Sequence, residues 1–468
     1  MDLFGVIWTR HQGIPTKLAD MVLTSTELRI TRHAAGMDCP GFSMLHDVAG
    51  LAEWNWARSQ DQELPPQLQA LLPPQDPHSP MRRLMYRLLE AKGVQRIGRQ
   101  PIEQEWLLLT HFGAGGIGHL DVFADDLSAQ AYYARPEPVL GDLTQASALW
   151  ACLREGLVNQ TDADSAAELM AQMQVTGVSG MIPKVFTSLG DAASQVLVKV
   201  EPPEYPRVLS VEALALELHR KAGLDVPDWR YREFAFGDEL LSALVLDRYD
   251  RDNDHHPIPQ ESFYTLLRTG NRSKYYERTD GAMETLFTVV NTPGLVANPF
   301  EVKYGIFQRF VMALATGNGD LHSDNFALIG RAGEARLAPV FDPAPMRAYR
   351  FFRKNHDILS ALQFSGIGGV DQQHPDGTPL DYTSSGQVPP DLRERVLALA
   401  RVAGIRPSRA TKWIKTALHV TEGFSEQACD LLSKAPAADR QRNRPAVDGF
   451  RATVEAMRSA LREASGSP

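Results

Sequence analysis

An aspartate, an asparagine five residues later and a second aspartate form the pattern in this chain that is best suited to chemistry. Asp320 and Asn325 lie in the stretch Gly-Asp-Leu-His-Ser-Asp-Asn-Phe at residues 319–326, and Asp342 follows two short apolar runs. Enzymes that transfer phosphoryl groups use such a carboxylate to orient the attacking hydroxyl, and the other two side chains to hold Mg²⁺. The pattern therefore predicts transfer of the γ-phosphate of ATP.

The local sequence predicts that these side chains lie close together. Phe326–Ile329 is predicted as a short strand, residues 330–333 as a turn and Ala335–Phe341 as a second strand. Such a hairpin places Asn325 and Asp342 at the same open end, with the first aspartate just upstream. Oxygen-bearing side chains that converge in this way suit Mg²⁺. The alternative is that the Asp and Asn residues are ordinary turn formers.

A lysine in an apolar strand favours the catalytic interpretation. Residues 196–200 are predicted as a strand, and alternation puts Lys199 opposite the valines, so that its ammonium can face a cleft. The alternative is a solvent-exposed lysine on an edge strand. A helix is predicted for Ser210–Lys221, with Ser210 as N-cap. Glu212 then either pairs with Lys199 or complements the helix dipole from the first turn.

Three further segments bear on nucleotide binding. Residues 176–184 supply small residues whose N–H groups can approach phosphates, with Lys184 as a countercharge, although the spacing is not that of a Walker A loop. Residues 246–251 follow a buried strand and are predicted to form an interlobe hinge whose backbone contacts adenine, or else a polar strand end. Residues 113–120 are glycine-rich but are predicted to be a structural β-turn, because neither a helical pattern nor a lysine follows.

Composition narrows the class of protein. Of the 468 residues, 43% are hydrophobic and 22% are charged, which is typical of a globular protein. The net charge of −9 disfavours a protein that coats nucleic acid by charge alone. The three cysteines, Cys39, Cys152 and Cys429, form neither a disulfide framework nor a zinc spacing. No apolar run approaches the roughly 18 residues of a membrane helix, so we expect a cytoplasmic protein without membrane contact.

The distribution of elements predicts an α+β fold, bilobal and protein-kinase-like, with a β-rich N-terminal subdomain and a mostly helical C-terminal lobe. The subdomain is expected over residues 1–140, where Glu27–Ile30 and Trp106–Leu109 are extended-type runs. A nucleotide-binding lobe is expected over 141–255 and the helical lobe over 256–468.

The order of these segments resembles the HipA family, the kinase toxins of bacterial type II toxin–antitoxin systems. Residues 179–184 are similar to the family's Ser-Gly-x-Gln-Pro-Lys-like loop, and residues 246–251 to its Glu-Arg-Phe-Asp-Arg-like segment. Residues 317–326 are similar to its catalytic Gly-Asn-x-Asp-x-His-x-Lys-Asn-Phe. Matching pieces run along nearly the whole chain.

The resemblance implies a role for individual residues. Asp320 would be the catalytic carboxylate, Asn325 and Asp342 would hold Mg²⁺, and Lys184 with Lys199 would contact the phosphates of ATP. The resemblance also places Asn325 and Asp342 at ATP, in addition to their role as Mg²⁺ ligands. The other residues that it places at ATP are Ser179, Gly180, Leu246, Asp247, Tyr249 and His322.

The resemblance also implies partners. Members of the family phosphorylate aminoacyl-tRNA synthetases and are neutralised by a small DNA-binding antitoxin, through which they meet DNA only indirectly. This chain departs from the family pattern at Asp324, where a lysine is usual. The serine that members autophosphorylate aligns with Gly177, so Thr176 and Ser179 are the nearest hydroxyl groups for autophosphorylation.

Three functions are compatible with these residues. The first is a Ser/Thr protein kinase of the HipA type, the second a kinase of small molecules such as antibiotics, and the third a non-catalytic subunit of a repressor complex. The presence together of Asp320, Asn325, Asp342 and Lys199 favours the first over the third, since a binding-only protein has no need of all four.

Overall fold

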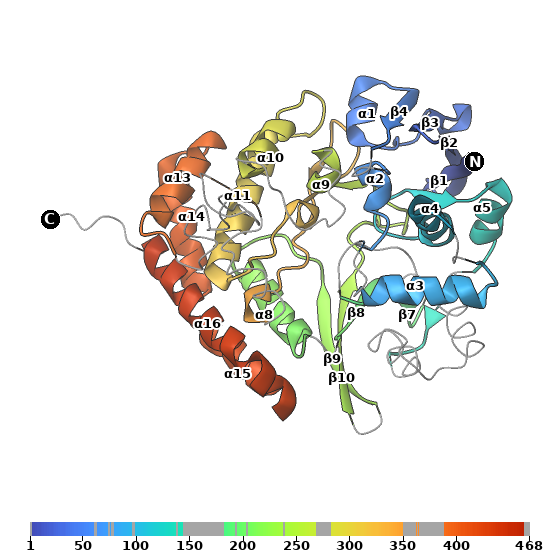
Figure 1. Cartoon of the computed structure of the whole chain (residues 1–468). Coiled ribbons are helices and arrows are strands. Elements are labelled where there is room, and N and C mark those ends of the chain that lie inside the picture. The colour runs from blue at the N-terminus through green and yellow to red at the C-terminus, as the bar shows by residue number, and fades with distance from the viewer. Residues whose placement is uncertain are drawn as a thin grey trace. The chain divides into compact units, whose positions relative to one another are not determined.

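The computed structural model comprises two compact units (Figure 1). The residues that it describes are 2–59, 63–73, 75, 79–95, 99–136, 139–143, 182–191, 194–202, 205–236, 239–267, 282–349, 362, 364 and 388–462. Unit 1 comprises Met1–Pro203, Asp228–Ser273 and Ile329–Ala335, and unit 2 comprises Glu204–Pro227, Lys274–Leu328 and Arg336–Pro468. Unit 1 carries most of the described strands and unit 2 the longest helices, as expected for the predicted α+β class.

The first sheet of unit 1 has five strands in the spatial order β4-β3-β2-β1-β5. These are the antiparallel strands β1 (Leu3–His11), β2 (Ile14–Leu23), β3 (Glu27–Arg32), β4 (Glu53–Ala57) and β5 (Asp121–Phe123). In β3, buried Leu28 and Ile30 alternate with exposed Arg29 and Thr31, so one face packs on the core while the other meets solvent. The extended run predicted at Glu27–Ile30 is therefore confirmed.

The second sheet of unit 1 contains the predicted lysine strand and has the order β6-β7-β8-β10-β9. Its strands are β6 (Val139–Leu140), β7 (Lys184–Leu189), β8 (Gln195–Val200), β9 (Trp229–Phe236) and β10 (Glu239–Asp247), of which only β6 and β7 pair in parallel. Strand β8 confirms the strand predicted at residues 196–200. Val185, Val198 and Val245 belong to the same buried core as Ile7 of the first sheet, so the two sheets share one core.

Residues 106–109, predicted as an extended run, lie instead in helix α4 (Pro101–Phe112). A capping box between Gln100 and Glu103 starts this helix, and Pro101 occupies its first turn. A short apolar run alone does not distinguish a strand from a helix, and here the start signal decides. The other elements of this part are α1 (Met44–Ala49), α2 (Pro66–Gln69), α3 (Pro80–Ala91), α5 (Asp126–Tyr133), β11 (Gln260–Ser262) and α9 (Phe263–Leu266).

Unit 2 is built mainly from helices, as predicted for the C-terminal part. They are α8 (Val208–Lys221), α10 (Ala282–Val290), α11 (Pro299–Thr316), α13 (Leu392–Val402), α14 (Pro407–Val420), α15 (Phe424–Ser433) and α16 (Ala437–Arg462). In the part of the chain that the structure describes, none of the helices is long and apolar enough to cross a bilayer.

Helix α8 starts earlier than predicted. Its N-cap is Arg207, in the left-handed conformation, and the hydroxyl of Ser210 donates to the Arg207 carbonyl at 2.8 Å from inside the helix. Ser210 is therefore not the N-cap. Glu212 lies beyond the first turn and is fully buried, so the interpretation of Glu212 as a first-turn acid is also wrong. The misplaced start arose because serine is a common N-cap, whereas here its hydroxyl bonds back to the preceding turn.

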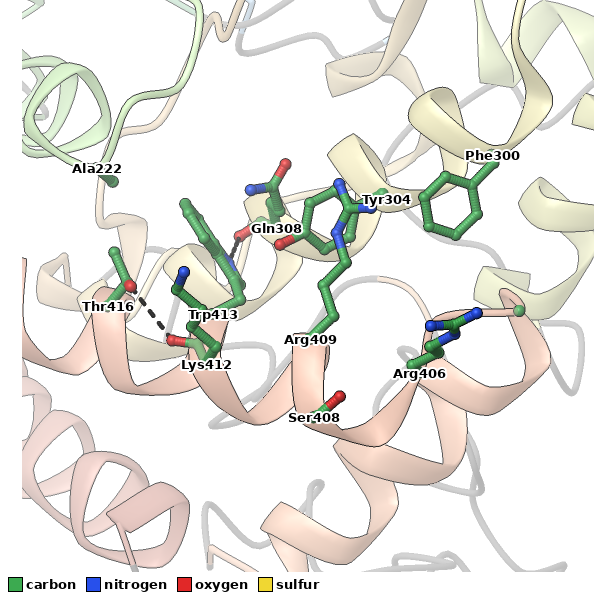
Figure 2. Close-up of a pocket in the computed structure, with 11 residues that line it drawn as sticks. Ala222, Phe300, Tyr304, Gln308, Arg406, Ser408, Arg409, Lys412, Trp413 and Thr416 are labelled. Carbon is green, nitrogen blue, oxygen red and sulfur yellow. Dashed lines mark hydrogen bonds between the residues drawn. The ribbon is translucent and has the colours of Figure 1, made fainter.

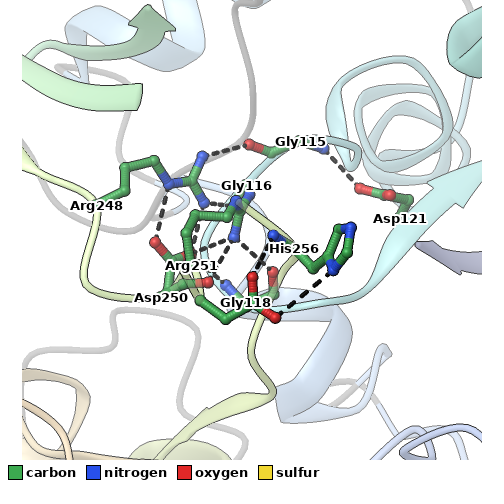
Figure 3. A network of polar contacts seen from close by, with 9 residues as sticks. Gly115, Gly116, Gly118, Asp121, Arg248, Asp250, Arg251 and His256 are labelled. Atoms are coloured by element: carbon green, nitrogen blue, oxygen red, sulfur yellow. Dashed lines mark hydrogen bonds and ion pairs between the residues drawn. The ribbon is translucent and has the colours of Figure 1, made fainter. Parts of the chain in front are cut away.

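A buried carboxylate joins the end of β10 to the glycine-rich stretch 113–120 (Figure 3). Asp250 accepts bonds from Arg248 at 2.9 and 2.5 Å, from Arg251 at 2.9 Å and from the Gly118 N–H at 2.9 Å. Arg248 also donates to the Gly116 carbonyl at 2.6 Å. Side chains thus engage the backbone of this stretch, which agrees with its structural interpretation.

We expect Asp250→Asn to destabilise the protein by about 3–5 kcal/mol at pH 7, because two buried guanidinium groups lose their carboxylate. Burial alone would raise the pKa of Asp250, but the charges of Arg248 and Arg251 outweigh burial and hold this pKa well below its ordinary value. The ionised carboxylate therefore stabilises the fold above the unfolded-state pKa of about 3.9 and loses this effect as the pH falls towards the folded-state pKa. In urea unfolding, the difference in unfolding free energy between wild type and Asp250→Asn should become smaller below about pH 4.

The matched control for this measurement is Glu27→Gln. Glu27 pairs with Arg29 at 2.9 Å, but both side chains are solvent-accessible: Glu27 is 34% exposed and Arg29 is 53% exposed. An exposed pair contributes about 0–1 kcal/mol. Equal losses of unfolding free energy in the two variants would contradict the role given to Asp250.

Candidate functional site

The predicted catalytic loop begins where helix α11 ends. Gly317 is the C-cap, with a φ of 71°, and its N–H donates to the Ala313 carbonyl. A Cβ at this position would lie 2.7 Å from Val454 and 2.8 Å from Phe450 of α16, so only glycine fits here without displacement. The packing of α11 against α16 thereby sets the direction in which the loop leaves the helix.

Backbone and side-chain bonds hold the loop in one conformation. The Asn318 side chain accepts the Asp320 N–H at 3.1 Å, and the His322 N–H donates to the Asp320 carbonyl at 2.9 Å. The Asn325 amide donates to the same carbonyl at 2.9 Å, which leaves its side-chain oxygen available as an acceptor. Asp320 and Asn325 are therefore in direct contact, as the spacing predicted.

His322 and Asp324 serve this loop as well. The His322 ring accepts the Asp324 N–H at 3.2 Å and caps the short 3₁₀ helix Ser323–Asn325. Both side chains are buried. In its described contacts His322 therefore orders the loop, while its contact with ATP stays a prediction. Asp324, the departure from the family pattern, is a buried acid next to Asn325.

The second predicted strand, Ala335–Phe341, is much shorter than expected. Strand β12 (Ala327–Ile329) is close to the prediction, but β13 contains only Arg336 and Leu337. The Arg309 guanidinium, from α11, contacts the carbonyl of Ala338 and lies 3.5 Å from that of Pro339. Since Pro339 also lacks an N–H, the ladder cannot continue past Ala338.

Asp342 follows this irregular segment in an uncommon backbone conformation. Its φ is 50°, in the left-handed region that residues other than glycine seldom adopt. Such strain persists where the surroundings hold it and is concentrated at functional sites. The observation marks Asp342 as a position with a special geometric requirement.

The two aspartates interact electrostatically. Burial, and after it the charge of Asp342, raises the pKa of Asp320 to about 8. Two neighbouring carboxylates of this kind favour a bound cation, since a divalent ion would relieve both the repulsion and the desolvation. With the Asn325 oxygen, the donor set is the hard oxygen set that Mg²⁺ prefers.

In unit 1, the two predicted phosphate-contacting lysines face each other across adjacent strands. Lys184 of β7 is the direct register partner of Lys199 of β8, and the residues are 3% and 2% exposed. Side chains opposite each other on neighbouring strands project from the same face, and like charges there are destabilising. The register therefore places two buried lysines next to each other on adjacent strands, which is compatible with the phosphate contacts predicted for them. Sequence analysis identified both lysines but not their pairing.

The predicted hinge is partly a structural element. Leu246 is buried at the end of β10, and the exposed Asp247 pairs with Arg230 at 2.9 Å. The Asp247 N–H donates to the Asp228 carbonyl at 2.8 Å and the Arg248 N–H to the Gln195 carbonyl at 3.2 Å. These two N–H groups are thus engaged within the protein. The ATP contacts of Leu246, Asp247 and Tyr249 stay predictions.

Several predicted residues lie elsewhere. Thr176, Ser179 and Gly180 lie outside the described residues, so the glycine loop and the site of autophosphorylation stay predictions. Lys199 belongs to unit 1 and Glu212 to unit 2, and their pairing also stays a prediction.

A cationic groove of about 1000 Å³ lies along α11 and α14 of unit 2 (Figure 2). The Arg409 guanidinium stacks over the Tyr304 ring, 3.9 Å from its centroid, and Glu301 lies 3.8 Å from Arg409. Arg406 and Lys412 line the same groove, and none of the described residues that line it is acidic. The groove therefore favours an anionic partner. Sequence analysis did not single out these residues.

A family model and two curated relatives match the sequence of this chain. The model of the HipA-like C-terminal domain matches residues 176–422, more than half of the chain. A Haemophilus influenzae protein named "Putative kinase" is 27% identical over 196 residues, and "Putative kinase Y4mE" from Sinorhizobium fredii is 24% identical over 270. The matches cover 38% and 54% of this chain, and only 55% and 60% of these relatives.

The fold is also that of a solved structure. HipA from Shewanella oneidensis MR-1, solved with HipB and operator DNA, matches 98% of this chain and 100% of its own with a TM-score of 0.53 and 14% identity. This likeness confirms the predicted kinase-like α+β fold.

We expect Gly317→Ala to destabilise unit 2 by about 2–5 kcal/mol, because left-handed strain adds to the clash of the new methyl group with α16. Gly404→Ala is the matched control: its φ is 75°, but no atom lies within 4 Å of the added Cβ. We expect strain alone to cost this control about 1–2 kcal/mol. Denaturant unfolding measures both, and equal losses would contradict the proposed packing of the loop.

Proposed function

The chain belongs to the HipA family, and on that premise we propose that it is a Mg²⁺-dependent kinase that transfers the γ-phosphate of ATP to a Ser or Thr hydroxyl of a protein. The observation that carries the proposal is the convergence of Asp320, Asn325 and Asp342 in one loop system. The names of the two curated relatives add support for a kinase.

Each residue has a defined task under this proposal. Asp320 orients the acceptor hydroxyl and takes its proton as the new phosphoester bond forms. Asn325 and Asp342 would hold Mg²⁺, which would supply positive charge that neutralises the phosphates. Lys184 and Lys199 bind the phosphate oxygens. Because phosphoryl transfer depends mostly on positioning and charge stabilisation, these groups suffice for catalysis.

The substrate is proposed from the family. A protein that acts in translation, such as an aminoacyl-tRNA synthetase, is the acceptor that the resemblance implies. A small-molecule kinase is the alternative, since it shares the same catalytic groups. A non-catalytic repressor subunit is disfavoured because two neighbouring, partly buried carboxylates, of which Asp320 has a raised pKa, are costly to keep without a use.

We also propose that the chain assembles with a DNA-binding antitoxin as the toxin of such a pair. The Shewanella oneidensis protein was solved with HipB and operator DNA. The groove at Arg406, Arg409 and Lys412 supports the proposal, because its cations, of which Arg409 lies 3.8 Å from Glu301, attract the phosphate groups of a DNA-bound complex.

We expect Asp320→Asn to lower transfer from γ-labelled ATP by about 10²–10⁴-fold, because the hydroxyl loses its proton acceptor. Acceptors are the protein itself and a bacterial lysate, and ATP binding is measured in parallel. Asp225→Asn is the control, since the Asp225 side chain is 63% exposed and its one ion pair among the described residues is with the exposed Arg336. A labelled lysate protein that disappears in Asp320→Asn identifies the substrate.

Other outcomes separate the alternatives. ATP binding without transfer to any protein would point to a small-molecule kinase. Transfer that Asp320→Asn leaves intact would contradict the catalytic role of Asp320. Absence of ATP binding would contradict the kinase proposal and favour the non-catalytic repressor subunit.

For the groove, we expect the double variant Arg409→Glu with Lys412→Glu to weaken binding of a labelled DNA duplex at low salt by about tenfold or more, because two phosphate contacts become repulsive. The control reverses two exposed cations outside the groove, Lys434→Glu with Arg444→Glu, whose side chains are 55% and 78% exposed. Equal weakening in both double variants would show only a general charge effect.

A further inference from the structure

A second cationic pocket lies wholly within unit 1, among β1, α5, β7 and the segment after β10. Its volume is about 70 Å³. Since one water needs about 10–15 Å³ of such space, the pocket holds roughly five waters, which suits a small oxyanion and excludes a nucleotide. Three arginines line it, Arg10, Arg248 and Arg251, and we call it the arginine pocket.

Arg10 is the arginine of this pocket that is not held by a direct ion pair, although its charge acts on Asp121 at longer range. Its guanidinium stacks over the Tyr133 ring, 5.4 Å from the centroid, and it forms no ion pair or side-chain hydrogen bond with any residue that the structure describes. The residue is partly buried on β1. A partly buried guanidinium that has no carboxylate partner is suited to bind an anion, because its five N–H donors match a tetrahedral oxyanion.

The other charges of the pocket are fixed by the protein. Arg248 and Arg251 share the single carboxylate of Asp250 (Figure 3). Asp121 accepts hydrogen bonds from the Gly115 N–H at 2.7 Å and from the Tyr133 hydroxyl at 2.5 Å, so both of its oxygens bond to residues that line the pocket. Even with both carboxylates ionised, three guanidinium groups face two carboxylates. One positive charge remains without compensation.

Arg251 lies in a buried environment beside a second guanidinium. Burial and the charge of Arg248 together outweigh Asp250 and lower the pKa of Arg251 to about 10. Burial is the larger of the two lowering causes, and the neighbouring charge of Arg248 adds to it although Arg251 contacts the Asp250 carboxylate at 2.9 Å. Thr187, Ser188 and Gln195 complete the lining with side chains that can donate hydrogen bonds to an oxyanion.

We propose that the arginine pocket binds a small oxyanion of the phosphate class, with Arg10 as its principal ligand. The bound ion would join β1, β7 and the segment after β10 within unit 1. The proposal does not depend on the kinase function, because Arg10 is not among the residues assigned to ATP or to catalysis.

Equilibrium dialysis of the full chain with labelled inorganic phosphate tests the proposal. We expect saturable binding at one site, weakened at least tenfold in Arg10→Gln and only partly restored in Arg10→Lys, which keeps the charge but not the fork. Arg29→Gln, an exposed arginine of the same sheet, should bind like wild type. The chloride concentration is adjusted so that all samples have equal ionic strength, which removes general salt effects.

The variant Lys199→Met shows whether phosphate binds in the arginine pocket or at Lys184 and Lys199. Phosphate binding kept in Lys199→Met and lost in Arg10→Gln supports the proposal, whereas the reverse assigns the ion to the lysine pair and overturns it. Unchanged binding in Arg10→Gln, or no saturable binding by wild type, also overturns it. Arg10→Gln should keep ATP binding and wild-type unfolding without phosphate, which excludes misfolding as the cause.

Glycerol phosphate, as a second ligand, distinguishes the source of the anion. Tight binding of this phosphomonoester would show that the pocket takes the phosphoryl group of a larger molecule. Binding of inorganic phosphate alone would identify the free ion as the ligand.

Discussion

The ion cluster of Asp250 with Arg248 and Arg251 is the interaction on which the rest of unit 1 depends. It joins the end of β10 to a glycine-rich stretch more than 130 residues earlier in the chain, since Gly118 and Asp250 are 132 residues apart. Buried ion pairs seldom add net stability over apolar packing, but removal of one partner is costly. The cluster is therefore best understood as a positional constraint. Arg248 extends it to β7, because its guanidinium lies 3.9 Å from the Phe186 ring centroid, and β7 carries Lys184 opposite Lys199.

In unit 2 the corresponding constraint is the exit of the catalytic loop from α11. Gly317 lets the chain turn against α16, and Arg309 of the same helix ends β13 early by occupying the carbonyls that would continue the ladder. The chain therefore reaches Asp342 along an irregular path and in a left-handed conformation. Both features break ordinary local preferences, and so does the pair of neighbouring carboxylates. Violations of this kind are expected where a structure serves a ligand at the expense of stability.

Local sequence predicted the elements whose signals are local. The strand at residues 196–200, the short strand after Asn325 and the helical C-terminal part were predicted because alternation and helical spacing are visible within a few residues. Two predictions failed although the deciding signal is local: Trp106–Leu109 are helical because a capping box starts α4, and Ser210 is not the N-cap because its hydroxyl bonds back to Arg207. The prediction of a long second strand failed because a distant group decides the outcome, since Arg309 contacts the carbonyl of Ala338.

The sequence by itself determined the family and the chemistry of the candidate site, since Asp320, His322 and Asn325 lie within a six-residue stretch and their spacing alone places them in one loop. Only the tertiary structure decided which charged groups lie together. The register of Lys184 with Lys199, the sharing of Asp250 by two arginines and the stacking of Arg10 over the Tyr133 ring follow from the packing of elements that are far apart in the chain. Periodicity reports which face of an element is buried, but it carries no information about the partner on the other side.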